Sequence, residues 1–230
     1  MGITAENLAE RYHIAREAQD EFALRSQERY QLGREAFAAD IVPVTTRGGE
    51  VAADEHPRPE SSLAGLAKLR PAFAANGTVT AGNASGINDA AGALVLVSDA
   101  QLARLGAQSL ATVGQWAVAG VDPNIMGIGP VPAIRRLLAK TQRTLDDYQV
   151  IEINEAFAVQ VLACVAELGI DAERVNAWGG AIAHGHPIAA TGAILVQKVV
   201  RQLQGRGGGR GLVAACIGGG QGLAAVIEKA

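Results

Sequence analysis

The spacing of apolar positions in the first part of the chain favours helices, followed by an irregular stretch. Apolar residues recur at helical intervals and predict a short helix through about Arg11, which Thr4 can cap, and a longer one over residues 16–31. Beyond residue 40 the pattern breaks up, and Pro and Gly residues predict short elements joined by turns. We expect an edge strand over 41–44, a turn at Gly48-Gly49, a loop over 56–59, a small-residue loop over 81–86, a helix beginning near Asn88, and an apolar strand over 94–97.

From about residue 108, short apolar runs alternate with amphipathic segments, which is typical of strands alternating with helices. The predicted strands lie near residues 111–119, 150–153, 175–177, 211–215 and 223–227, and the predicted helices near 132–140, 155–168 and 191–203. Strands that are apolar throughout indicate a sheet covered on both faces. The sequence therefore predicts an α/β fold.

Composition and charge exclude several classes of protein. Lys and Arg number 20 against 23 Asp and Glu, so there is no basic excess to attract a nucleic acid. The apolar run over residues 93–97 is too short to cross a bilayer, and no signal peptide is visible. Two cysteines are too few for a disulfide framework and suit a reducing compartment. We expect a cytoplasmic protein that binds neither nucleic acid nor membrane.

Three polar residues follow predicted strands, at the end of the sheet where ligands bind in open α/β folds. Asn154 ends the strand over 150–153, and its side chain either caps the following helix or orients a water or substrate oxygen. His186 lies in a glycine-rich segment before Pro187, where an imidazole either exchanges protons or is simply a hydrogen-bonded structural residue. His184 and His186 also raise the less favoured possibility of a metal site.

Cys216 ends the predicted strand over 211–215 and is followed by glycines from Gly218 onward. A cysteine in this position is usually a small buried hydrophobe, and Cys164, in the middle of a helix, is interpreted in that way. Glycines directly after Cys216 expose backbone N–H groups that could hold an oxyanion. A thiol, an imidazole and such N–H groups together are the parts of an acyl-transfer site.

The chain resembles the thiolase family of acyl-CoA acyltransferases. Three blocks carry the resemblance: Asn154-Glu155-Ala156-Phe157-Ala158, Gly179-Gly180-Ala181-Ile182-Ala183 with Gly185-His186-Pro187, and Cys216-Ile217-Gly218-Gly219-Gly220-Gln221-Gly222. The segments Met1–Asn7 and Thr78–Asp89 are similar to the family as well. The resemblance implies the layered α/β/α thiolase fold and either thiolytic cleavage or Claisen condensation of a 3-ketoacyl-CoA. Coenzyme A would be a substrate, and no cofactor or metal is implied.

The resemblance also implies a role for each matching residue. His186 matches the histidine that activates the nucleophilic cysteine, and Asn154 the asparagine that holds a water in one oxyanion hole. Cys216 matches the acid/base cysteine, and the backbone N–H of Gly218 contributes to the other oxyanion hole. On the CoA-binding side stand Ser85, Arg58, Ala156 and Phe157.

The nucleophilic cysteine of thiolases lies in an N-terminal half that precedes the segment matched by Met1, and neither cysteine of this chain corresponds to it. The resemblance therefore divides the chain into a CoA-binding loop region over residues 1–87, the tail of an N-terminal half over 88–107, and a C-terminal half over 108–230. We expect a polypeptide carrying the N-terminal half to be needed, within a homo- or hetero-oligomer. Trp178 and His184 stand where the family often has Asn and Leu.

A different class of function stays open, namely a non-catalytic thiolase-like module that binds an acyl-CoA or a partner protein. Such a module would bind CoA without turnover. An acid/base thiol has little use in a binding module, and therefore His186 and Cys216 favour the enzyme.

Overall fold

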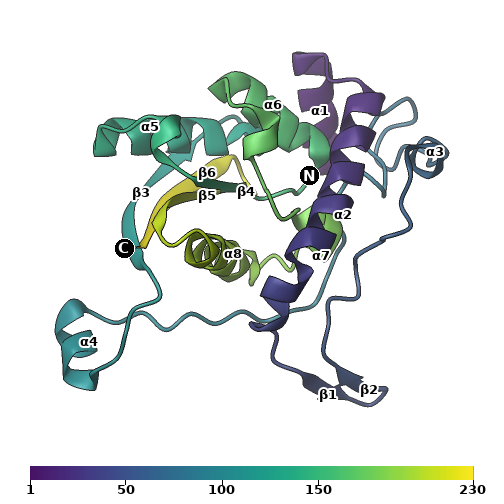
Figure 1. Ribbon diagram of the computed structural model, residues 1–230. Coiled ribbons are helices and arrows are strands. Elements are labelled where there is room, and N and C mark those ends of the chain that lie inside the picture. The colour runs from purple at the N-terminus through teal and green to yellow at the C-terminus, as the bar shows by residue number, and fades with distance from the viewer. Residues whose placement is uncertain (230) are drawn as a thin grey trace.

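The computed structural model describes residues 1–229, and its first hundred residues contain two long helices and few other regular elements (Figure 1). Helix α1 spans Gly2–Tyr12 and α2 spans Arg16–Ala38. A small antiparallel hairpin joins β1 (Val44–Thr46) to β2 (Gly49–Val51), and the short helices α3 (Leu63–Leu66) and α4 (Asp99–Leu105) follow. The helices begin near the predicted positions, although α2 extends seven residues beyond the expected Gln31.

A four-stranded mixed sheet forms the centre of the molecule. Its strands are β3 (Thr112–Gly120), β4 (Val150–Ile153), β5 (Gly209–Ile217) and β6 (Gln221–Lys229), in the order β3-β6-β5-β4. Strand β4 runs parallel to β5, whereas the other two pairs are antiparallel. The tight turn between β5 and β6 covers residues 218–220, so the glycines that begin two residues after Cys216 form a hairpin turn.

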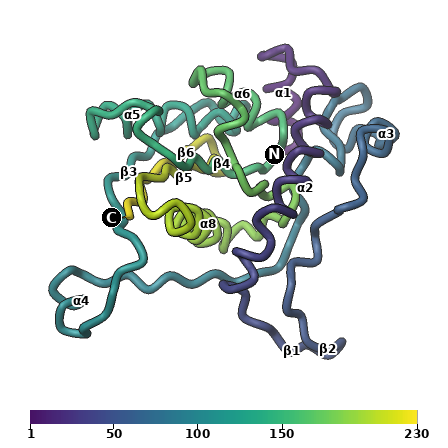
Figure 2. Tube along the Cα trace, viewed as in Figure 1, coloured from purple at the N-terminus to yellow at the C-terminus, as the bar shows by residue number. Residues whose placement is uncertain are grey.

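Helices cover both faces of the sheet, as the apolar strands predicted (Figures 1 and 2). The helices are α5 (Pro130–Thr141), α6 (Ala158–Leu168), α7 (Ala181–His184) and α8 (Thr191–Gly205), and 3₁₀ turns lie at Pro123–Ile128, Leu145–Asp147 and Ala172–Arg174. On β5, Leu212 faces the core shared with α1, α5 and α6, while Val213 faces the smaller core under α8. Because successive side chains of a strand point to opposite faces of the sheet, each face of the sheet packs against its own apolar core.

Several predicted elements are shortened or shifted in the structure. The expected strand over 175–177 is reduced to a single parallel bridge between Val175 and Ile151 of β4. The helix expected from Glu155 begins at Ala158, and the edge strand expected over 41–44 begins only at Val44. Thr4 lies inside α1, where its hydroxyl donates to the carbonyl of Met1, because the helix already begins at Gly2.

The segment between the loop region and the sheet departs furthest from the prediction. Neither the helix expected near Asn88 nor the strand expected over 94–97 forms within residues 1–229. A strand requires a hydrogen-bonded neighbour, and none of the described strands lies beside this segment. Val95 is 93% exposed, and α4, which stands apart from the body in Figure 2, has none of its seven residues buried.

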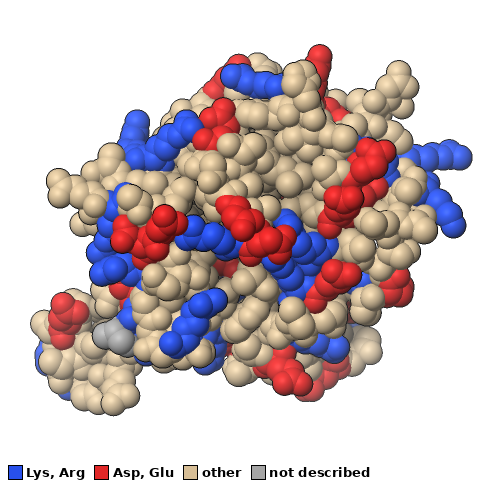
Figure 3. Space-filling view, turned by 45° about the horizontal axis from the view of Figure 1, so that its top comes forward, with Lys and Arg blue, Asp and Glu red and all other residues tan. Residues whose placement is uncertain are grey.

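Charges of both signs are interspersed on the face of the molecule shown in Figure 3. No helix among residues 1–229 is both long enough and apolar enough to span a bilayer.

Candidate active site

The backbone brings the three predicted segments together at one end of the sheet. Asn154 follows β4 directly, and its N–H donates to the carbonyl of Ala214 on β5 at 2.9 Å. Cys216 lies two residues beyond Ala214 on that neighbouring strand. Since β4 and β5 are parallel, their carboxyl ends meet at the same edge. Val175, bridged to the other side of β4, leads into the segment that carries His186.

His186 is partly buried and bonded at three atoms. Its backbone N–H donates to Asn88 Oδ1 at 2.9 Å, its Nδ1 lies 2.7 Å from Thr191 Oγ1, and its Nε2 lies 3.3 Å from Asn154 Nδ2. Burial lowers the pKa of the His186 imidazole, so the ring is neutral at pH 7. A neutral imidazole can accept a proton from a nearby thiol.

The side-chain amide of Asn154 points toward the ring of His186, and it does not cap helix α6. Helix α6 begins only at Ala158 and has Phe157 at its N-cap position, so the capping interpretation of Asn154 is wrong. Asn154 is buried, and among the described residues its Oδ1 has no hydrogen-bond partner. A buried amide oxygen without a partner is ordinarily satisfied by a water or a ligand, which fits the alternative interpretation.

Glu155 belongs to the support of the site rather than to a helix terminus. Its buried carboxylate accepts hydrogen bonds from Ser26 Oγ at 2.6 Å, Asn176 Nδ2 at 2.8 Å and the backbone N–H of Ile182 at 3.2 Å. Burial raises the pKa of this carboxyl, and the hydrogen bonds oppose that effect. Glu155 thus ties α2 and the end of β4 to the glycine-rich segment before His186.

The two cysteines occupy different environments. Cys216 is a partly exposed residue next to the turn, and desolvation by the surrounding protein raises the pKa of its thiol to about 11. The thiol is therefore protonated at neutral pH and can serve as an acid. Gly218 lies exposed in the adjoining turn. Cys164 is buried on α6, its thiol donates to the carbonyl of Gly127 at 3.4 Å, and burial raises its pKa further.

Ser85, Ala156 and Phe157 meet beside Asn154. The N–H and the hydroxyl of Ser85 both donate to the carbonyl of Ala156 at 3.1 Å. The ring of Phe157 packs edge-on against Phe73, with centroids 6.0 Å apart. Ser85 and the adjacent pair Ala156 and Phe157, which lie far apart in the sequence, are therefore side by side next to Asn154.

Arg58 lies on a neighbouring exposed loop. Its guanidinium donates to the carbonyls of Glu55 and Pro57. The imidazole of His56 in the same loop packs so closely on Gly86 that a Cβ there would lie 2.4 Å from the ring. The loop is thereby fixed against the segment that carries Ser85.

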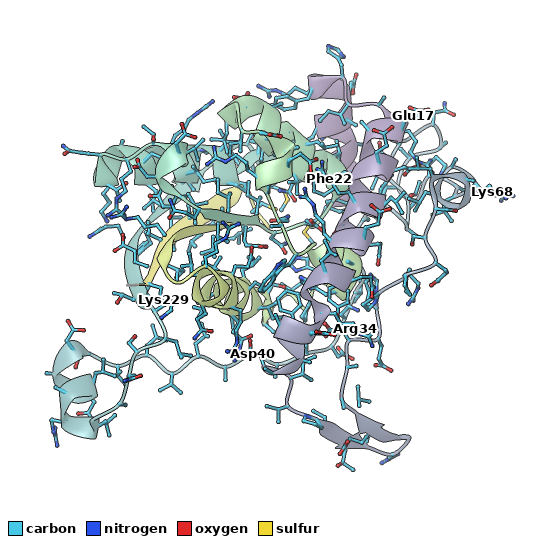
Figure 4. The ribbon with its side chains drawn as sticks, viewed as in Figure 1. Glu17, Phe22, Arg34, Asp40, Lys68 and Lys229 are labelled. Carbon is cyan, nitrogen blue, oxygen red and sulfur yellow. The ribbon has the colours of Figure 1, made fainter. Side chains whose placement is uncertain are left out.

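Helices α2 and α8 frame the site from the side of the loop region. Asp40, just beyond α2, points toward α8 in Figure 4 and forms an ion pair with Arg201 of that helix. Among residues 1–229 no group of three or more His, Cys, Asp or Glu side chains is arranged to hold a metal ion. His184 Nδ1 donates to the carbonyl of Gly185 at 3.0 Å instead.

Two contact residues of His186 were missed in the sequence. Asn88 was expected to start a helix, and Thr191 was expected only as the first residue of the helix over 191–203. The sequence offers only two signals for these contacts. One is the amide of Asn88, which follows a loop of small residues, and the other is the hydroxyl of Thr191, five residues after His186. Neither pattern reveals the contact, because both depend on how loops distant in sequence pack.

Comparison with protein-family models gives two matches that together span nearly the whole chain. The model of the thiolase N-terminal domain matches residues 1–100, and that of the thiolase C-terminal domain matches residues 107–229. The curated relatives include a β-ketoadipyl-CoA thiolase of Pseudomonas aeruginosa, 53% identical, and an acetyl-CoA acetyltransferase of Rhizobium meliloti, 50% identical. The whole chain aligns with 59% and 60% of these proteins, so it spans about three fifths of their length.

Solved structures show the same similarity. The acetyl-CoA acetyltransferase of Bacillus anthracis superposes with a TM-score of 0.94 at 48% identity, over 99% of this chain and 59% of that one. Human mitochondrial 3-ketoacyl-CoA thiolase in complex with CoA superposes with a TM-score of 0.92 at 41% identity, over 100% and 59%.

Proposed function

Because the chain belongs to the thiolase family, we propose that it supplies the acid–base and CoA-binding part of an acyl-CoA acyltransferase. The reaction is thiolytic cleavage of a 3-ketoacyl-CoA or the reverse Claisen condensation. In cleavage, the bond between the α and β carbons breaks and the acyl group passes to a cysteine thiolate located outside these 230 residues. The electron pair left on the α carbon takes a proton from Cys216, which releases acetyl-CoA. The thiol of a free CoA then gives its proton to the Cys216 thiolate, and its sulfur attacks the acyl-cysteine, so that the acyl group leaves on CoA and the nucleophilic thiolate is regenerated.

The observation that carries this proposal is the pairing of His186 with Asn154 beside the end of β5. His186 Nε2 takes the proton of the nucleophilic thiol, and the amide of Asn154 holds a water that completes an oxyanion hole. The protonated thiol of Cys216, with its pKa raised to about 11, is suited to donate rather than to attack. The backbone N–H of Gly218, in the exposed turn, stabilises the second oxyanion.

Coenzyme A binds along the wall formed by Ser85, Ala156 and Phe157, with Arg58 near its charged end. The contacts between Ser85 and Ala156 support this placement, and so does the similarity to a human thiolase whose structure contains CoA. Arg58 is exposed, so its contribution is electrostatic and weakens with salt.

The remainder of the active site comes from the part of the family's length that this chain does not span. We propose the division into residues 1–87, 88–107 and 108–230, with the last forming a complete layered C-terminal half. The exposed apolar segment over 94–97 and helix α4 join the strands of the N-terminal half, within a cytoplasmic homo- or hetero-oligomer. That association would cover Val95, which is now almost fully exposed.

The test is a complementation assay with acetoacetyl-CoA and a longer 3-ketoacyl-CoA. The purified chain is mixed with a polypeptide carrying the N-terminal half, and the CoA-dependent cleavage rate is measured. We expect no cleavage by the chain alone, cleavage by the complex, and loss of cleavage in Cys216→Ala. Cys164→Ala is the matched control and keeps activity, since its sulfur is buried in α6.

A stable complex that binds CoA without any turnover would refute the catalytic role and favour a non-catalytic acyl-CoA-binding or partner-binding module. Cleavage by the chain alone that disappears in Cys216→Ala would show Cys216 to be the nucleophile, contrary to the acid/base role.

A further inference from the structure

The hydrogen bonds around His186 determine which of its two ring nitrogens carries the proton. The hydroxyl of Thr191 has one hydrogen, and Oγ1 lies 2.9 Å from the carbonyl oxygen of Pro187, which can only accept. With its hydrogen used there, Oγ1 must accept from His186 Nδ1 at 2.7 Å. At the other side of the ring, Asn154 Nδ2 can only donate, so Nε2 must accept.

A second contact fixes the backbone of the same residue. Asn88 Oδ1 accepts the N–H of His186 at 2.9 Å, and Ile87 forms a parallel bridge with His186. Gly185, with φ +97°, lies so close that a Cβ there would be 2.6 Å from Asn88 Cγ. The chain around Asn88 therefore holds the histidine loop by close packing as well as by a hydrogen bond.

From these contacts we propose that Thr191 and Asn88 are positioning residues for His186. Thr191 keeps the proton on Nδ1 and leaves Nε2 free to act as the base, while Asn88 holds the backbone so that the ring faces Asn154. This inference rests on the proposed role of His186. Free imidazole favours the opposite tautomer, with the proton on Nε2, so removal of the Thr191 hydroxyl removes a bond that opposes this preference.

Nitrogen-15 NMR of the ring atoms tests the role of Thr191 in the chain as it stands. The chain has four histidines, and His186→Gln assigns the His186 signals. In the wild type at pH 7.5 we expect Nδ1 protonated and Nε2 unprotonated. In Thr191→Val the ratio of tautomers shifts about tenfold toward Nε2–H, the factor that one such hydrogen bond is worth. Thr191→Ser restores the wild-type ratio.

Thr141→Val is the matched control, because the Thr141 hydroxyl likewise donates to the carbonyl four residues earlier but contacts no histidine. It leaves the His186 ratio unchanged. A wild-type spectrum with the proton on Nε2 would overturn the proposal without any variant, and so would an unchanged ratio in folded Thr191→Val.

Amide hydrogen exchange tests the role of Asn88. Protection of the His186 N–H falls at least about tenfold in Asn88→Ala, and Asn88→Asp, which keeps an acceptor oxygen, retains it. Equal protection in all three chains would refute the role of Asn88. Both measurements use the chain without substrate, so a negative complementation assay leaves their result intact and can be told apart from it.

Discussion

Replacing Glu152 with glutamine would leave the ammonium group of Lys198 without a carboxylate partner inside the protein. Lys198 Nζ lies 2.7 Å from Glu152 Oε2, and the two side chains are 2% and 0% exposed. The same ammonium donates to the carbonyl of Gly179, where the segment leading to His186 begins. Gln202 Nε2 donates to Glu152 Oε1 at 2.6 Å, a bond that the new amide oxygen can still accept.

The expected loss is large because the remaining charge is desolvated. Removing one partner of a buried ion pair costs about 3–5 kcal/mol, because it leaves the other charge uncompensated, whereas replacing both partners with well-packed hydrophobic residues of similar volume is often neutral. In a chain of this size 1 kcal/mol moves the melting temperature by about 2–4 °C, so Glu152→Gln lowers it by about 6–20 °C. The double variant Glu152→Gln/Lys198→Met recovers most of that loss.

Urea unfolding followed by circular dichroism measures these free energies. Asp146→Asn is the matched control, since Asp146 also pairs with a cation, Arg174, but its side chain is 88% exposed. We expect that control to change the unfolding free energy by less than about 1 kcal/mol. Losses of similar size in Glu152→Gln and Asp146→Asn would refute the reasoning, because the difference between them rests on burial alone.

Three further predictions concern acid, backbone space and assembly. Burial, together with the charge of Lys198, lowers the pKa of His184 to about 3. Below about pH 6.5 the unfolded chain therefore binds a proton on this imidazole that the folded chain does not bind. The free energy of unfolding therefore falls with decreasing pH, by at most about 1.4 kcal/mol per unit, and urea midpoints at pH 7.5 and 5.5 should show a smaller fall in His184→Leu. Gly179→Ala places a Cβ 2.3 Å from the carbonyl oxygen of Ser26, whereas the Cβ of Gly207→Ala, also at positive φ, would meet open space. Melting curves should show Gly179→Ala to be less stable than Gly207→Ala by at least about 2 kcal/mol. Val95→Asp should leave the unfolding free energy within about 0.5 kcal/mol of wild type and prevent complementation by the N-terminal half; retained complementation would exclude the segment from that contact.

Periodicity alone determined the elements that carry their own apolar pattern. Helix α8 begins at the predicted residue 191, β4 has the predicted bounds, and β5 and β6 contain the predicted runs. Each of these segments repeats apolar positions over at least a full turn or several alternations, which is a local signal. The polar residues at the ends of β4 and β5 were found in the same way.

Tertiary structure decided whatever depends on a neighbour. Residues 94–97 are as apolar as β4, yet only β4 is a strand, because β5 lies beside it to pair with its backbone. Asn154 lies between a strand and a helix, a position typical of an N-cap. Helix α6 begins four residues later, however, and the amide of Asn154 instead contacts the ring of His186. The bonds from His186 to Asn88 and Thr191 join loops that share no sequence pattern. Hydrogen bonding between distant segments depends on where packing places each backbone, and a periodic pattern specifies only which face of an element is buried.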